Sequence, residues 1–249
     1  MKGYINLLNG INKNLENNLK LSVIICVYNE FETIKLIINK VISAKLPNNI
    51  SKEIIIIDNN STDGTKQILE DLNKNTNFKI FFNKDNLGKG YSISKGIKEA
   101  SGDYIIFQDA DLEYDPKDYY NLINYLIQNK LDFVYGSRIV KNKKYHRYNL
   151  HKYVVIFYSF LINLLFKAKF TDTATNYKLF KSDVIKKINL TSKSFAIDFE
   201  ITVKLVKKKY IYDEVPISYN PRSYDQGKKI NVNDAFKSLF IIIKLYFFK

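Results

Sequence analysis

The sequence predicts an α/β protein whose central, mostly parallel sheet is flanked by helices. Short apolar runs recur along residues 21–107, and such runs are typical of strands buried on both faces. Stretches with helical apolar spacing separate the runs, so strands and helices alternate. Polar clusters at 28–30, 58–63 and 109–111 directly follow three of the runs, where open parallel sheets bind their ligands.

Four strands and three helices are expected in the first half of the chain. Residues 21–27 (LSVIICV) form an apolar run, and helical spacing of apolar residues follows over 30–44. We expect Ser61 or Thr62 to cap the next helix, and a turn at Gly88 to open the third. The other expected strands cover 53–57, 78–82 and 103–107, and the other expected helices cover 63–72 and 88–100.

The second half is less regular but continues the same domain. Asp115-Pro116 opens a helix, because proline suits the first helical turn. The expected strands cover 132–136, 177–180 and 211–215, and the expected helices cover 118–128, 148–166, 199–207 and 232–248. We expect a leader at 1–20, one domain over 21–230 with an interfacial helix at 148–168, and a C-terminal amphipathic helix over 231–249.

The chain of 249 residues is strongly basic, with 39 Lys and Arg against 25 Asp and Glu and a formal charge of +14. Only three of these cations are arginines, and the aromatic residues cluster on apolar segments, so the pattern does not indicate a nucleic-acid partner. A basic surface suits an anionic membrane or a phosphorylated substrate. One cysteine and two histidines argue against a disulfide framework and a zinc site.

Two carboxylates, Asp109 and Asp111, follow the buried run at 105–107. Because an uncompensated buried carboxylate is costly, a hard cation such as Mg²⁺ or Mn²⁺ would explain them, with phosphate oxygens of a substrate as further ligands. Gln108 and Glu113 flank the pair and could complete the shell. A solvated turn that caps the next helix is the alternative interpretation.

Four motifs stand in order after the expected strands: YNE at 28–30, DNNSTDGT at 58–65, NLGKG at 86–90 and DAD at 109–111. Together they resemble family 2 glycosyltransferases with the GT-A fold, a Rossmann-like sheet flanked by helices. Later segments are similar to the branch that glycosylates dolichyl or other polyprenyl phosphates, and the resemblance covers about residues 21–240. These segments are GSR at 136–138, TDTATNYKLF at 171–180, FAIDFE at 195–200, EVPISY at 214–219, Arg222, and GK at 227–228.

The resemblance implies a donor site for a nucleotide sugar of the GDP-mannose or UDP-glucose type. Tyr28 and Glu30 would hold the nucleobase and ribose, Asp58 would contact the nucleobase, and Lys89 would lie near the nucleotide or sugar. The family usually has a second Asp where this chain has Asn59, which keeps hydrogen-bonding capacity but removes a charge.

The same resemblance implies roles on the metal and acceptor side. Asp109 and Asp111 would bind the metal, with Asp109 also on the sugar-nucleotide side and Asp111 catalytic. Arg138 would meet the acceptor phosphate. Arg222, also a catalytic candidate, and Lys228 would close over the donor diphosphate or the acceptor phosphate.

The acceptor decides whether the inverting transfer needs a general base. A saccharide hydroxyl must lose a proton, so Asp198 or Glu200 would have to act as a base. A lipid phosphate is already charged at neutral pH and needs cations instead. We favour the polyprenyl phosphate, with extension of a cell-surface glycan as the alternative within the family and a non-catalytic basic binding module as the alternative outside it.

The helices at 148–166 and 232–248 are apolar, flanked by lysines and too short to span a bilayer. These properties are typical of helices that lie in a membrane interface. Packing on the sheet, or a contact between two copies, is the alternative. No secretory signal opens the chain, so we expect a cytoplasmic protein that rests peripherally on the inner face of a membrane.

Overall fold

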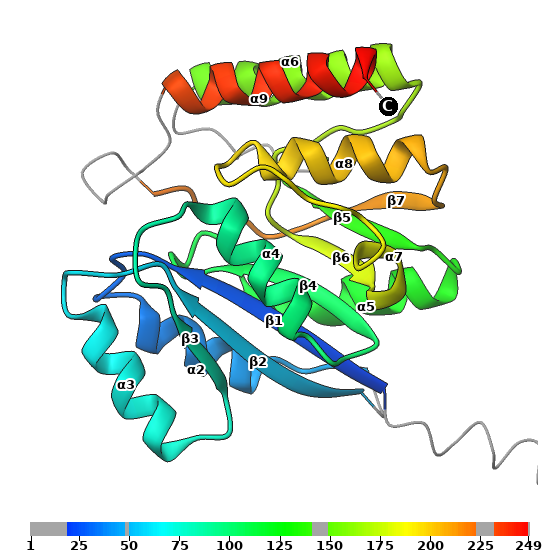
Figure 1. The fold of residues 1–249 in the computed structure, drawn as a ribbon. Helices are drawn as coiled ribbons and strands as arrows, with labels where there is room; N and C mark the ends of the chain where they lie inside the picture. The colour runs from blue at the N-terminus through cyan, green and yellow to red at the C-terminus, as the bar shows by residue number, and fades with distance from the viewer. Residues whose placement is uncertain (1–18, 48–49, 141–148, 223–231, 249) are drawn as a thin grey trace, which may run out of the picture.

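A computed structural model describes residues 19–47, 50–140, 149–222 and 232–248, which fold around one mixed sheet (Figure 1). The strands in this part of the chain are β1 (Leu19–Val27), β2 (Ile50–Asp58), β3 (Lys79–Phe82), β4 (Tyr104–Asp109), β5 (Phe133–Ser137), β6 (Lys178–Lys181) and β7 (Tyr212–Pro216). Their order across the sheet is β3-β2-β1-β4-β6-β5-β7. Only β6, among these strands, runs antiparallel to its neighbours, so the expected fold class is confirmed.

The helices of the described residues match the expected ones closely. They are α2 (Ile34–Ser43), α3 (Thr65–Asn75), α4 (Lys89–Glu99), α5 (Tyr119–Gln128), α6 (Asn149–Phe166), α7 (Ser182–Ile185), α8 (Ile197–Lys207) and α9 (Val232–Phe247), with a 3₁₀ turn at Pro116–Asp118. Every expected strand and helix is present with ends that differ by a few residues. The four-residue α7 is the helix that no sequence pattern predicted.

The start of α3 differs from the expectation. The helix expected over 63–72 begins at Thr65, after Gly64 in a left-handed conformation (φ 97°). The carboxylate of Asp63 accepts hydrogen bonds from the Thr65 backbone N (3.0 Å) and hydroxyl (2.6 Å). Ser61, which we expected as the cap, instead accepts a hydrogen bond from a backbone N–H in the loop after β1. The cap prediction was therefore wrong.

The two faces of the sheet bury separate apolar cores because side chains alternate along each strand. In β1, Ile24 joins the core beneath α4, α6, α8 and α9, whereas Val23 and Ile25 join the core beneath α2, α3 and α5. Helices α6 and α9 lie side by side outside α8 (Figure 1), and the Tyr158 hydroxyl donates to the Ala235 carbonyl (2.7 Å) between them. In the described part of the chain, no helix combines the length and apolarity needed to cross a membrane.

The polar clusters meet at one edge of the sheet, as expected. Strand β1 lies between β2 and β4, and its last residues pair with Asp58 on one side and Asp109 on the other. The backbone N–H of Asn59 continues this pairing by donating to the Val27 carbonyl (2.8 Å). Segments far apart in the sequence therefore deliver their polar side chains to the same place.

Glu53 ties the opposite end of the sheet together. Its carboxylate accepts hydrogen bonds from the Ser22 hydroxyl (2.5 Å) and from the backbone N–H and hydroxyl of Ser101 (2.8 and 2.7 Å). Lys79 adds an ion pair at 2.7 Å. Burial alone would raise the pKa of Glu53, but these partners outweigh it and lower the pKa to about 2.

Glu53→Gln should lower the free energy of unfolding by about 1–3 kcal/mol at pH 7, because donors lose their charged acceptor. A group whose pKa falls on folding stabilises the protein above its unfolded value of 4.5 and loses that effect as the pH drops toward 2. The difference from wild type in urea unfolding should therefore shrink below pH 4.5. Glu70→Gln, at an exposed pair with Lys66, is the control and should change little.

Candidate active site

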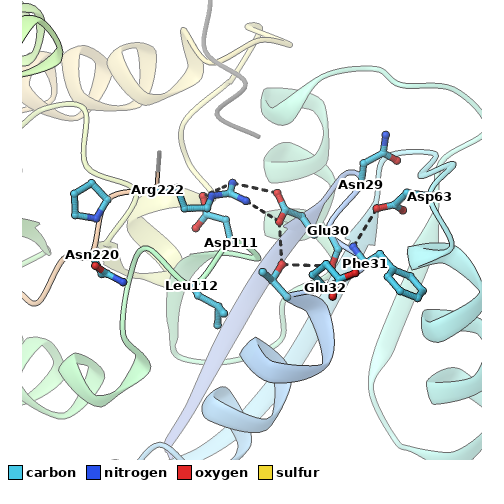
Figure 2. Close-up of a pocket in the computed structure, with 11 residues that line it drawn as sticks. Asn29, Glu30, Phe31, Glu32, Asp63, Asp111, Leu112, Asn220 and Arg222 are labelled. Atoms are coloured by element: carbon cyan, nitrogen blue, oxygen red, sulfur yellow. Dashed lines mark hydrogen bonds and ion pairs between the residues drawn. The ribbon is translucent and has the colours of Figure 1, made fainter. Parts of the chain in front are cut away.

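A cavity of about 650 Å³ opens at the carboxyl edge of the sheet (Figure 2). It is lined by residues 29–33 after β1, by Asp63, by residues 111–112 after β4, and by residues 220–222 beyond β7. Leu112 adopts a left-handed backbone conformation (φ 64°), which is strained for a branched side chain and is typical of functional turns. The cavity thus combines residues of three motifs singled out from the sequence, at 28–30, 58–65 and 109–111, with Arg222.

Arg222 joins two acids on opposite walls of this cavity. Its Nη2 lies 3.0 Å from Asp111 Oδ2, and its Nη1 and Nη2 donate to the two carboxylate oxygens of Glu30 at 3.1 and 3.2 Å (Figure 2). Burial, reinforced by the charges of Asp109 and Glu113, raises the pKa of Asp111 to about 7 despite the opposing effect of Arg222. Burial and the neighbouring acids therefore disfavour the charged form of Asp111.

Glu113 fixes the chain that carries Arg222. Its carboxylate accepts hydrogen bonds from the backbone N–H of Arg222 (2.8 Å) and from the Tyr219 hydroxyl (2.6 Å). Its backbone carbonyl accepts from the Asn220 N–H (2.9 Å). The sequence suggested Glu113 as part of a metal shell, whereas the structure shows it positioning the segment after β7.

Asp109 belongs to a buried row of alternating charges. Lys89, the first residue of α4, lies 3.1 Å from Asp109 and 4.0 Å from Asp198 in the first turn of α8. The other carboxylate oxygen of Asp198 accepts from Lys178 (2.8 Å), whose side chain is fully buried. Burial would lower the pKa of Lys89, but the charges of Asp109 and Asp198 raise it, so its ammonium stays charged. Lys178 is the first residue of β6, and it stands in the motif at 171–180, where no role was expected for it from the sequence.

Glu200 is not brought to the cavity. Its side chain is fully buried, and its carboxylate accepts hydrogen bonds from Thr191 and from the Ser192 backbone N–H (2.7 Å). Lys204 forms an ion pair with it at 2.5 Å. Asp198, two residues earlier on α8, contacts Lys178 and Lys89, whereas Glu200 faces the loop at Thr191 and Ser192.

Arg138 is buried in a bidentate ion pair. Its Nε and Nη2 donate to the two oxygens of Asp172 at 2.7 and 2.8 Å, and the Asp172 side chain is fully buried. The rings of Tyr114 and Tyr219 lie 5.9 and 5.1 Å from the guanidinium carbon. The structure therefore gives Arg138 a protein partner, and its contact with an acceptor phosphate stays a prediction.

The remaining expected residues lie around or beyond this centre. Asp58 is fully buried at the end of β2 and accepts from the Ser61 backbone N–H (3.2 Å), while Tyr28 is half-buried directly after β1. Asn59 holds the loop before α4, because it donates to Asn86 Oδ1 (2.6 Å) and accepts from the Leu87 N–H (3.1 Å). The expected residue Lys228 lies outside the described residues.

A divalent cation suits the oxygen donors at this edge. Burial raises the pKa values of Asp109 and Asp111, which means that their charged forms are disfavoured. A bound dication would stabilise the two carboxylates in their charged forms. The described residues hold no cluster of three or more Asp, Glu, His or Cys side chains arranged for a metal. Mg²⁺ and Mn²⁺ commonly use one or two carboxylates and take their other ligands from water and substrate phosphates. Asp109 and Asp111 would supply the protein ligands.

A mostly parallel sheet with carboxylates and cations at its carboxyl edge is the architecture of a GT-A glycosyltransferase. Solved structures share it over most of the chain. Glucosyl-3-phosphoglycerate synthase from Mycobacterium tuberculosis, in complex with Mn²⁺, UDP and phosphoglyceric acid, has a TM-score of 0.67 at 14% identity, covering 92% of this chain and 78% of that one. TarS from S. aureus in complex with UDP-GlcNAc has a TM-score of 0.56 at 18% identity, covering 91% and 66%.

Sequence comparison adds the family. Residues 22–189 match the family described as glycosyl transferase family 2, and the chain belongs to that family. Dolichol-phosphate mannosyltransferase from Pyrococcus furiosus is 27% identical over 213 residues, which are 84% of this chain and 59% of that protein. Poly-beta-1,6-N-acetyl-D-glucosamine synthase from Staphylococcus epidermidis is 30% identical over 210 residues, which are 82% and 48%. The chain thus spans about half the length of these relatives.

Asp172→Asn should destabilise the protein by about 3–5 kcal/mol in chemical denaturation, because it leaves the buried Arg138 charge without its counter-ion. Asp183→Asn, at an exposed pair with Lys187, should change the stability by no more than about 0.5 kcal/mol. A loss below 1 kcal/mol in Asp172→Asn would show that Arg138 is compensated elsewhere and can serve an anionic ligand directly.

Proposed function

We propose that this glycosyltransferase moves a sugar, with inversion, from a nucleoside-diphosphate sugar of the GDP-mannose or UDP-glucose type to a polyprenyl or dolichyl phosphate. One observation carries the proposal: Lys89 pairs with Asp109 and Arg222 pairs with Asp111 at the carboxyl edge of the sheet, and Asp111 and Arg222 line the cavity there. The 27% identity to a dolichol-phosphate mannosyltransferase supports the choice of acceptor.

The departing nucleoside diphosphate dictates what the donor side must do. A divalent metal on Asp109 and Asp111 would act as a Lewis acid toward the leaving diphosphate. Lys89 and Arg222 supply positive charge at the same edge, where low dielectric strengthens its effect on developing negative charge. Tyr28 and Asp58, at the ends of β1 and β2, would hold the nucleoside.

The candidate general bases favour a phosphate acceptor over a saccharide hydroxyl. Asp198 has one oxygen on Lys178 and the other toward Lys89, and Glu200 is enclosed beneath its loop. A hydroxyl nucleophile needs a base within hydrogen-bonding reach, whereas a phosphate monoester, with a second pKa near ~6, attacks as an anion. The 30% identity to a poly-N-acetylglucosamine synthase is the observation that keeps glycan extension as the second candidate.

A lipid acceptor requires contact with a membrane, and α6 and α9 expose an apolar surface suited to it. Its most exposed large side chains are Tyr153, Phe157, Phe160 and Leu164 on α6 and Phe236, Phe240, Phe247 and Phe248 at α9, each at least half exposed. Exposed lysines 167, 169, 237 and 244 lie at or beside these helices. Aromatic and aliphatic side chains next to lysines bind the interface of anionic bilayers. We place the protein peripherally on the cytoplasmic face.

Asp111→Asn should reduce sugar transfer to polyprenyl phosphate by at least about 100-fold, because a neutral amide is a weak metal ligand at the leaving group. The assay follows radiolabel from GDP-mannose or UDP-glucose into the organic phase, with Mn²⁺ or with EDTA. Asp71→Asn, at an exposed position on α3, is the control and should match wild type. Transfer to saccharides but to no lipid phosphate would reject the acceptor.

Replacing Phe157 and Phe240 together by Ser should weaken binding to vesicles of phosphatidylcholine and phosphatidylglycerol by at least about tenfold. The variant can no longer bury these two apolar rings in the bilayer interface, and that burial favours binding. Leu36→Ser removes a side chain of similar exposure from α2, beneath the opposite face of the sheet, and should bind as wild type does. Equal co-sedimentation of the double variant and wild type would exclude this surface as the membrane contact.

A further inference from the structure

The contacts of Arg222 differ from those of an arginine that only stabilises the fold through an ion pair. Its Nη1 and Nη2 both donate to the Glu30 carboxylate, and Nη2 also donates to Asp111. Its side chain is 18% exposed at the cavity wall. Its Nε is buried and has no hydrogen-bond partner among the described residues. An unpaired buried donor is costly, and a donor on an arginine fork matches a phosphate oxygen.

Arg222 donates to a carboxylate oxygen of Asp111 that a bound metal would also need as a ligand. Asp111 Oδ2 lies 3.0 Å from Nη2, so a single positive charge stands where a dication is expected. A metal that bound alone would meet Arg222 at close range and would pay for like-charge repulsion. A diphosphate that arrived with the metal would give the displaced guanidinium a new partner.

Arg222 is freer to move than Lys89. Lys89 is the first residue of α4, lies between Asp109 and Asp198, and has the Phe195 ring 5.4 Å from its ammonium. Arg222 lies in an irregular segment on a long side chain, and Glu113 holds only its backbone. Glu30, in turn, is fixed by Thr33, whose hydroxyl donates to its carboxylate at 2.9 Å.

We infer that Arg222 couples metal binding to nucleotide binding: it occupies Asp111 in the empty site and turns to the donor diphosphate when the metal takes Asp111. Glu30 is the positioning residue that keeps the guanidinium beside the cavity in both states. This inference rests on the proposed function. It means that metal and nucleotide each bind weakly alone and strengthen one another by the same factor, as linkage requires.

The test is a thermodynamic cycle for the binding of Mn²⁺ and nucleotide. The dissociation constant of Mn²⁺ is measured from the EPR signal of free Mn²⁺, first without nucleotide and then with saturating UDP or GDP. In wild type, the nucleotide that binds should tighten Mn²⁺ at least about tenfold. In Arg222→Gln, Mn²⁺ alone should bind several-fold tighter than in wild type, and the tightening by nucleotide should fall below about threefold. Glu30→Gln should weaken the binding of Mn²⁺ without nucleotide, because Arg222 then loses its carboxylate partner at position 30 and pairs more strongly with Asp111.

Controls separate this coupling from a general field effect. Lys117→Gln removes one exposed positive charge and should leave the Mn²⁺ affinities with and without nucleotide unchanged. Arg222→Lys keeps the positive charge but lacks the guanidinium fork, so it should retain only part of the coupling. Circular dichroism and thermal unfolding verify that each variant is folded. If Arg222→Gln tightens Mn²⁺ equally with and without nucleotide, the inference is overturned while the proposed function stands. If neither UDP nor GDP binds wild type with Mn²⁺, both are overturned.

Discussion

Burying two carboxylates at the end of a central strand demands compensation, and the arrangement of the site follows from that demand. Asp109 and Asp111 come from the same strand end, yet their cations come from α4 and from the segment beyond β7. An uncompensated charge in this partly buried position is costly, and the two cations brought by distant segments offset that cost. Burial still disfavours the charged forms of the same carboxylates, which leaves the edge ready for a cationic ligand.

Close backbone packing fixes one of these cations. A Cβ at Gly88 or Gly90 would lie 2.3 Å from the Lys193 carbonyl oxygen or 2.2 Å from that of Ser192, so only glycine fits on either side of Lys89. The Gly90 N–H donates to the Lys193 carbonyl at 2.8 Å. Glu200 secures the start of this loop, because its carboxylate accepts hydrogen bonds from the backbone N–H groups of Thr191 and Ser192.

Local patterns predicted the elements but could not predict the ion pairs. Apolar runs identified β1 and β4, because burial on both faces favours apolar residue types. The pairs of Glu30 with Arg222 and Lys178 with Asp198 join residues separated by long stretches of chain, and neither periodicity nor spacing records such contacts. The order of β6 and β5 in the sheet, with β6 antiparallel, is likewise a property of the tertiary packing.

Two of the three arginines in this lysine-rich chain stand where their geometry is used. Arg138 and Arg222 each place two nitrogens on the two oxygens of one carboxylate, a geometry that a lysine ammonium lacks. Asp172, which holds Arg138, is followed by Thr173, whose hydroxyl lies 3.0 Å from that of Ser159 on α6. One loop therefore links the buried arginine to the helix that exposes apolar side chains.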